Sequence, residues 1–209
     1  MHVYMPLFPL NLVAFPDETL NLHIFEPRYK QMMQDILNGD RTFGVVAYVT
    51  DELDYGTEVK VDQVVRVYPD GRMDIKTTGQ RIFRIQKFEN PIPGKLYARG
   101  EVEIIQQIED GKPETRDQLI HLIQHFFDAI QAPEPLQISE DMCTFDVAHR
   151  IGLSAEQKYH LLQCSLESER QQMVIDHLEK AIPLLKNVEV TRDRIRMNGH
   201  FRHFDPLSF

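Results

Sequence analysis

The sequence predicts a mixed α+β protein in which a small barrel or strongly curved sheet, with one early helix, precedes a bundle of helices. Three observations support this class. Short apolar runs separated by turn residues fill the first half, as in compact β structures. Helical spacing appears near the start, at 28–37, and again after residue 113. An apolar content of 42% is enough for a core.

The first thirty residues contain apolar runs of strand length, with prolines at their edges. These runs cover 6–10, 13–16 and 20–25. Proline cannot donate to a sheet ladder, so it marks strand starts and turns. Apolar and aromatic residues then follow helical spacing from Tyr29 to Leu37. Pro27 suits the first turn of that helix because its missing N–H would be unpaired there.

The next sixty residues alternate between strand patterns and turns. Residues 43–49 form a continuous apolar run, which is typical of a strand buried on both faces. Strand patterns at 57–61, 64–68, 73–77, 81–85 and 97–105 follow. Pro69-Asp70-Gly71-Arg72 predicts a hairpin turn. We expect Gly79 to interrupt the strand that returns from this turn.

The second half is predicted to be helical after a polar linker at 106–113. Apolar residues at helical spacing between Leu119 and Ile130 indicate an amphipathic helix, with Glu114 or Thr115 as its cap. A short helix is expected at 145–151, and Ser154 with Gln157 forms a capping-box pattern. We expect the last helix to run from about Ser168 to Leu185 and to be kinked or ended by Pro183.

The predicted organisation is therefore a β-barrel subdomain at 1–108, a helical subdomain at 114–190 and a charged, aromatic tail at 191–209. The tail carries Arg192, Arg194, Arg196 and Arg202. A solvated, unstructured tail is the simpler interpretation, and a basic arm that docks a partner is the alternative.

Charge and targeting signals narrow the classes of function. The formal net charge is −9, and acidic residues outnumber basic ones in both halves, so nucleic-acid binding is disfavoured. No apolar run approaches the roughly 18 residues of a spanning helix, and no signal peptide precedes the first strand. We therefore expect a cytoplasmic protein without a membrane partner. Cys143 and Cys164 form no disulfide framework.

Candidate catalytic and metal sites are weak. His121 and His125 are four residues apart, a spacing that can place two imidazoles on one metal, but ordinary boundary histidines are the simpler interpretation. The sequence contains no Gly-x-Ser-x-Gly elbow and no Gly-x-x-x-x-Gly-Lys-Ser/Thr loop. We expect no catalytic residue, no metal and no cofactor.

Candidate binding residues come from two patterns, and each has a structural alternative. Arg81 and Arg84 flank Phe83, which predicts either a cationic groove around an aromatic anchor or a solvated strand face. Glu26 and Arg28 are either a ligand-facing pair or a helix-start contact. The prolines near Phe8 and Phe15 indicate an exposed apolar strip or, as is more common, core residues.

Three segments resemble the N-terminal, substrate-recognition domain of ATP-dependent Lon proteases. The most specific is Ile24–Tyr29, the second combines 69–72 with 79–85, and the third is 151–154. The chain most resembles the small bacterial proteins that consist of this domain alone. The resemblance implies a PUA-like mixed β-barrel followed by a helical bundle, without the ATPase and Ser-Lys protease domains of full Lon. Asp17 departs from the family pattern, which places glycine in that turn.

The resemblance implies a non-enzymatic module that binds exposed apolar or unfolded polypeptide segments, or a partner in proteolysis. The candidate peptide-binding residues are Phe8, Phe15, Glu26, Arg28, Arg81, Phe83 and Arg84. PUA-like barrels also hold RNA, nucleotides and small molecules, so one of these ligands is the alternative function. The oligomeric state is left open by the sequence.

Overall fold

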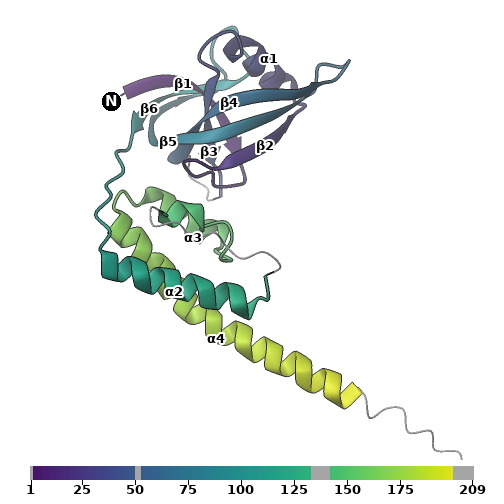
Figure 1. Cartoon of the computed structure of the whole chain (residues 1–209). Helices are drawn as coiled ribbons and strands as arrows, with labels where there is room; N and C mark the ends of the chain where they lie inside the picture. Colours follow the sequence, from purple (N-terminus) through teal and green to yellow (C-terminus); the bar gives the residue numbers. More distant parts are fainter. Residues whose placement is uncertain (1, 50–52, 133–141, 200–209) are drawn as a thin grey trace, which may run out of the picture. The chain divides into compact units, whose positions relative to one another are not determined.

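The computed structural model describes residues 2–49, 53–132 and 142–199, and it confirms the mixed α+β class. Figure 1 shows strands that curve around one another beside a short helix, with the other helices later in the chain. The six strands are β1 (His2–Leu10), β2 (Thr19–Ile24), β3 (Thr42–Ala47), β4 (Tyr55–Val67), β5 (Met73–Glu89) and β6 (Ala98–Ile104). The helices are α1 (Pro27–Ile36), α2 (Pro113–Ala129), α3 (Ala155–Gln163) and α4 (Glu167–Gly199), with a 3-10 turn η1 at Thr144–Asp146.

The sheet closes on itself through its longest strand. Its order is β2-β5-β4-β3-β1-β6, and β5 also pairs with β6. The first half of β5 pairs with β2 from Met73 to Thr78, whereas its second half pairs with β6 from Phe83 to Glu89. Five strands therefore form a closed ring, and β2 is added to β5 as an edge strand.

Two buried clusters lie on opposite faces of the central strands. One gathers around Phe8, Phe43 and Val45 and includes the apolar face of α1, where Tyr29, Met32 and Met33 are buried. The other contains Leu7, Val46 and Phe83. Neighbouring residues of β1 and β3 thus enter different clusters, which confirms the prediction of a strand buried on both faces.

Gly79 does not interrupt its strand, contrary to the prediction. Strand β5 runs through it without a break. A Cβ at this position would overlap the carbonyl oxygen of Phe15, and the Gly79 N–H donates to the carbonyl of Glu18 at 2.9 Å. The missing side chain at Gly79 therefore leaves room for the turn that precedes β2. Asp17 in that turn has a φ of 59°, the left-handed region that glycine occupies more easily.

Replacing Gly79 with alanine is expected to lower the free energy of unfolding by about 3 kcal/mol, because the new methyl group must displace backbone rather than a flexible side chain. Gly39→Ala is the matched control, since its nearest neighbour is the Ile36 carbonyl oxygen at 3.8 Å. Urea denaturation measures both variants. Equal stability of the two variants would contradict the close approach at Gly79.

The chain divides into two compact units that differ from the predicted subdomains. One unit contains Met1–Asp110 and Cys143–Arg170, and the other contains Gly111–Met142 and Gln171–Phe209. The residues from 143 to 170, expected in the helical subdomain at 114–190, thus group with the sheet. The ring of Phe145 stacks on Phe15 at a centroid distance of 5.0 Å, and His149 Nε2 lies 2.7 Å from Glu18 Oε2. These contacts join side chains far apart in the sequence, so local patterns did not reveal them.

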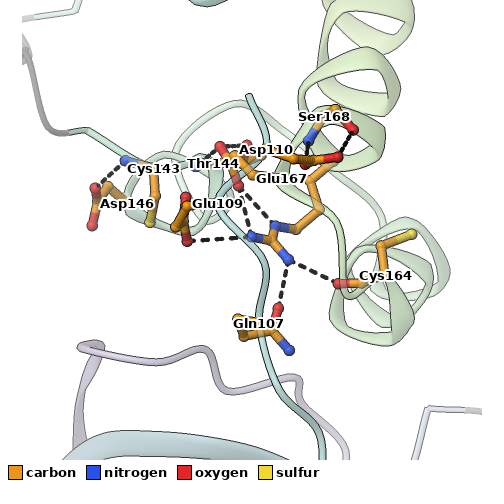
Figure 2. Close-up of polar contacts among 10 residues, drawn as sticks. Gln107, Glu109, Asp110, Cys143, Thr144, Asp146, Cys164, Glu167 and Ser168 are labelled. Carbon is orange, nitrogen blue, oxygen red and sulfur yellow. Dashed lines mark hydrogen bonds and ion pairs between the residues drawn. The ribbon is translucent and has the colours of Figure 1, made fainter. Parts of the chain in front are cut away.

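A buried arginine connects several segments of the first unit. The Arg170 side chain is fully buried, and its Nε donates to Glu167 Oε2 at 2.8 Å. Its Nη1 donates to the Cys164 carbonyl oxygen at 2.9 Å and to the Gln107 side chain. Glu167 in turn accepts the Thr144 hydroxyl at 2.6 Å, as Figure 2 shows. The segment after β6, η1, the end of α3 and the start of α4 therefore meet at one ion pair.

The predicted linker at 106–113 is partly fixed in this unit. Ile108 exchanges backbone hydrogen bonds with Ser165 and Glu167, both at 2.9 Å. Asp110 accepts hydrogen bonds from the Ser168 N–H and hydroxyl at 2.9 and 2.8 Å (Figure 2). These bonds hold the pKa of the Asp110 carboxyl below its usual value. Asp110 thus caps the first turn of α4, where a negative charge is favoured.

The predictions of α1 to α4 are confirmed in type and differ at the ends, but the short helix expected at 145–151 is the 3-10 turn η1 followed by further turns. Helix α2 buries Leu119, Ile123, Phe126 and Phe127 but begins at Pro113, because proline fits the first helical position and Lys112 precedes it as the cap. The Ser154–Gln157 capping box is present at the start of α3.

Pro183 does not end the last helix. Helix α4 continues through it to Gly199, and the burial of Leu178 and Ile182 holds the turns before the proline. The first residues of the predicted tail at 191–209 thus belong to this helix, and 200–209 lie outside the described residues.

Candidate functional site

The three phenylalanines of the predicted binding site lie in the core. Phe15 and Phe83 are 0% exposed, and Phe8 is 6% exposed. Phe8 packs on Tyr29 with ring centroids 3.7 Å apart. These rings stabilise the sheet and are not part of an exposed strip. The core alternative therefore describes Phe8 and Phe15, and Phe83 is not a surface anchor between its flanking arginines.

The charged members of the predicted site are exposed but separated. Arg28 bonds Glu26 Oε2 at 2.9 Å through Nε and lies over the ring of Tyr29. On β5, Arg81 bonds the buried carboxylate of Glu58 at 2.7 Å, and Arg84 lies 5.9 Å from the Tyr55 ring centroid. The structure does not gather these side chains around Phe83. Their role in peptide binding stays a prediction.

A different group of exposed and half-buried side chains does come together, at the end of the sheet where β2, β4 and β5 meet the hairpin turn. We call it the aromatic surface. It consists of His23, Phe25, Arg66, Tyr68, Arg72 and Asp74.

Strand register places these residues side by side. Asp74 pairs across the sheet with His23 of β2 on one side and with Arg66 of β4 on the other. Residues opposite each other in a sheet point to the same face, so the three side chains form one row. Phe25 follows two residues after His23, and its ring stacks on the imidazole at a centroid distance of 5.9 Å. Phe25 is 58% exposed, unusually high for a phenylalanine.

Asp74 holds the row together. It lies 2.6 Å from His23 Nδ1 and accepts the Tyr68 hydroxyl at 2.8 Å. These two hydrogen bonds lower the pKa of the Asp74 carboxyl, and the bond to Asp74 raises the pKa of Tyr68. Asp74 is thus a carboxylate and Tyr68 a neutral phenol at neutral pH. Both arginines lie near the tyrosine ring, with guanidinium carbons 4.6 Å (Arg66) and 5.1 Å (Arg72) from its centroid.

This arrangement suits binding through stacking and charge. An exposed phenylalanine supplies apolar area, and guanidinium groups held on an aromatic ring keep their donors in one plane. The cysteines are a poor basis for covalent catalysis, because burial raises the pKa of the Cys143 thiol to about 11 and also raises that of Cys164.

The part of the chain that the structure describes contains neither a cluster of metal ligands nor a helix that could span a membrane. Within residues 2–49, 53–132 and 142–185, no three His, Cys, Asp or Glu side chains gather as a metal site requires. His121 and His125 stack with ring centroids 5.1 Å apart. No helix in the same ranges has the length and apolar character needed to cross a membrane.

An alternating pattern in the sequence around β2 indicates part of the aromatic surface. Between Leu20 and Phe25, apolar residues alternate with Asn21 and His23, which places Asn21, His23 and Phe25 on the outer face of a strand. Tyr68 and Arg72 flank the turn that the sequence predicted correctly. Their meeting with His23 depends on β2 pairing with β5, which brings together residues about fifty positions apart.

The closed sheet, its early helix and the helical segment docked on it define a class of small mixed α+β domains. Residues 4–180 match the model of the ATP-dependent protease La (LON) substrate-binding domain, and the chain belongs to this family of substrate-recognition modules. The resemblance found in the sequence is thereby confirmed.

Individual relatives agree with this assignment. The chain is 24% identical over 203 residues to the Lon protease of Cytophaga hutchinsonii. This alignment covers 87% of this chain and 25% of that protease. It is 26% identical over 107 residues to protein cereblon of Danio rerio, covering 47% of this chain and 25% of cereblon. The chain thus spans about a quarter of the length of each of these curated relatives.

Solved structures show the same fold. A Lon N-terminal domain protein from Xanthomonas campestris superposes with a TM-score of 0.64 at 26% identity, covering 83% of this chain and 98% of that one. The N-terminal domain of the Mycobacterium avium complex Lon protease gives a TM-score of 0.67 at 14% identity, covering 85% and 98%. The second likeness concerns the fold alone.

Proposed function

We propose that this protein binds exposed apolar or unfolded polypeptide segments, including those of a partner in proteolysis, through the aromatic surface and without catalysing a reaction. The observation that carries the proposal is the exposed ring of Phe25, stacked on His23 beside two arginines. Membership in a family of substrate-binding domains supports it.

The edge strand offers a second element of recognition. In the described chain β2 pairs with β5 and occupies the end of the strand order, so one row of its backbone groups has no strand partner. An extended segment can add to such an edge with little demand on its sequence. Phe25, at the end of this strand, then supplies apolar contact. Binding of this kind is weak and broad, because a flexible segment loses conformational entropy when it docks.

The test compares two exposed aromatic residues. Phe25→Ser is expected to weaken binding of a reduced, carboxymethylated, permanently unfolded protein about tenfold, because it removes a central apolar contact. Tyr4→Ser is the matched control, since Tyr4 is 60% exposed and lies on β1, at the other side of the sheet order. Fluorescence anisotropy of the labelled unfolded protein gives the dissociation constants, and circular dichroism verifies folding.

Equal dissociation constants for Phe25→Ser and the unmodified protein would reject the aromatic surface as the binding site. The absence of binding by the unmodified protein at any accessible concentration would reject polypeptide binding itself.

A further inference from the structure

We propose that the aromatic surface selects segments in which an acidic side chain lies close to an apolar one, with Arg66 binding the carboxylate and Phe25 contacting the apolar group. The inference rests on the proposed polypeptide-binding function and adds the chemical class of the ligand. It follows from the geometry around Arg66, from the charges beside it and from the spacing of the strands.

Arg66 is oriented before any ligand arrives. Its guanidinium carbon lies 4.6 Å from the centroid of the Tyr68 ring, and the Tyr68 hydroxyl is fixed by Asp74 at 2.8 Å. A guanidinium stacked on a ring directs its N–H groups outward in the ring plane, where they match the two oxygens of a carboxylate. Because the side chain is already ordered, binding costs less rotamer entropy than with a freely moving arginine.

The neighbouring carboxylates are already engaged. Asp74 lies 2.6 Å from His23 Nδ1, and Asp70 bonds Arg72 at 2.6 Å. Among the described residues, no carboxylate lies within ion-pair distance of the exposed Arg66 guanidinium, although the charge of Arg66 also contributes to the lowered pKa of Asp74 on the neighbouring strand. A ligand carboxylate can therefore pair with Arg66 without displacing an internal partner.

Strand spacing sets the distance between the two features of the ligand. Arg66, Asp74 and His23 lie on three adjacent strands, so Arg66 and the β2 row are about 10 Å apart. A segment in the polyproline II conformation rises about 3.1 Å per residue and presents every third side chain on the same face, so we expect the acidic and apolar residues about three positions apart. The protein's net charge of −9 repels a strongly acidic chain, so we expect recognition of a single carboxylate rather than an acidic run.

The test uses labelled peptides of neutral polar residues with an amidated C-terminus, one phenylalanine and, three positions away, either glutamate or glutamine. Fluorescence anisotropy is expected to show about fivefold tighter binding of the glutamate peptide. Arg66→Gln should abolish this preference and keep the binding of the glutamine peptide. Arg99→Gln is the matched control, because Arg99 is also exposed and lies over a tyrosine, Tyr4, at 5.7 Å, but belongs to no candidate binding site.

Several results would overturn the proposal. If the preference survives in Arg66→Gln, or falls equally in Arg99→Gln, the carboxylate is not bound at Arg66. If glutamate and glutamine peptides bind the unmodified protein equally well, the inference fails while polypeptide binding stands. A preference that needs a free C-terminus assigns the site to a terminal carboxylate and also rejects the proposal. If neither peptide binds, and the unfolded protein does not bind either, the proposed function fails with it.

Discussion

Replacing Arg170 with methionine is expected to lower the free energy of unfolding by about 3–5 kcal/mol, one of the two largest effects that the structure predicts. The Arg170 side chain is fully buried, and its partner Glu167 is 1% exposed. Methionine fills similar volume but leaves the Glu167 carboxylate in the interior with no countercharge. Urea denaturation followed by circular dichroism measures the decrease in the free energy of unfolding.

A second variant separates charge from packing. In the double variant Arg170→Met with Glu167→Gln, the buried charge is removed and an oxygen still accepts the Thr144 N–H and hydroxyl, which lie 3.0 and 2.6 Å from the glutamate. We expect this double variant to be more stable than Arg170→Met alone. A double variant as unstable as the single one would show that packing on Phe145, 4.4 Å from the guanidinium, matters more than the ion pair.

An exposed ion pair is the control for the effect of burial on the Arg170–Glu167 pair. Arg28 and Glu26 lie 2.8 Å apart at the surface, and Arg28→Met is expected to cost less than about 1 kcal/mol. The contrast between Arg28→Met and Arg170→Met tests burial as the cause of the difference.

Phe83→Ala is expected to lower the free energy of unfolding by about 3–5 kcal/mol, because it empties a fully buried site. The ring occupies space that two glycines leave free: a Cβ at Gly44 would lie 2.7 Å from the ring, and one at Gly56 would lie 2.6 Å from it. Neither glycine has a side chain that can fill the cavity. Denaturant unfolding again gives the magnitude.

Variants of Phe25 and Phe83 distinguish a binding role from a role in the core. Phe25→Ala, which truncates a phenylalanine that is 58% exposed, is expected to cost less than about 1 kcal/mol. Phe83→Leu keeps most of the buried volume, so the folded variant should bind the unfolded protein with an unchanged dissociation constant. Weaker binding by folded Phe83→Leu would return Phe83 to the binding site that the sequence suggested.

Element type was predictable wherever neighbours in the sequence carry the signal. The apolar spacing of α1 and α2, the turn at Gly71 and the Ser154 capping box each depend on residues within a few positions of one another. The failures concern glycine and proline. Gly79 was expected to interrupt β5, but the strand continues there and the Phe15 carbonyl approaches it closely. Pro183 was expected to kink or end the last helix, and α4 does not end there.

The candidate site was less predictable because exposure is a property of the folded sheet. Phe8, Phe15 and Phe83 have the composition of a binding strip, and alternation by itself does not say which face of a closed sheet meets water. Phe25 lies in the segment that showed the family most clearly, yet its exposure depends on β2 being an edge strand. Family resemblance thus pointed to the segment that carries the proposed site without showing which of its side chains are exposed.

The sequence by itself determined the mixed α+β class, the order of most elements, the family and the weakness of any catalytic motif. These depend on local spacing and on residue types that can be counted along the chain. Only the tertiary structure decided that Arg170 is an internal ion-pair partner, that three phenylalanines are core, and that His23, Phe25, Arg66 and Tyr68 share one surface. Burial and pairing are set by contacts between segments distant in the sequence, and no local pattern encodes those distances.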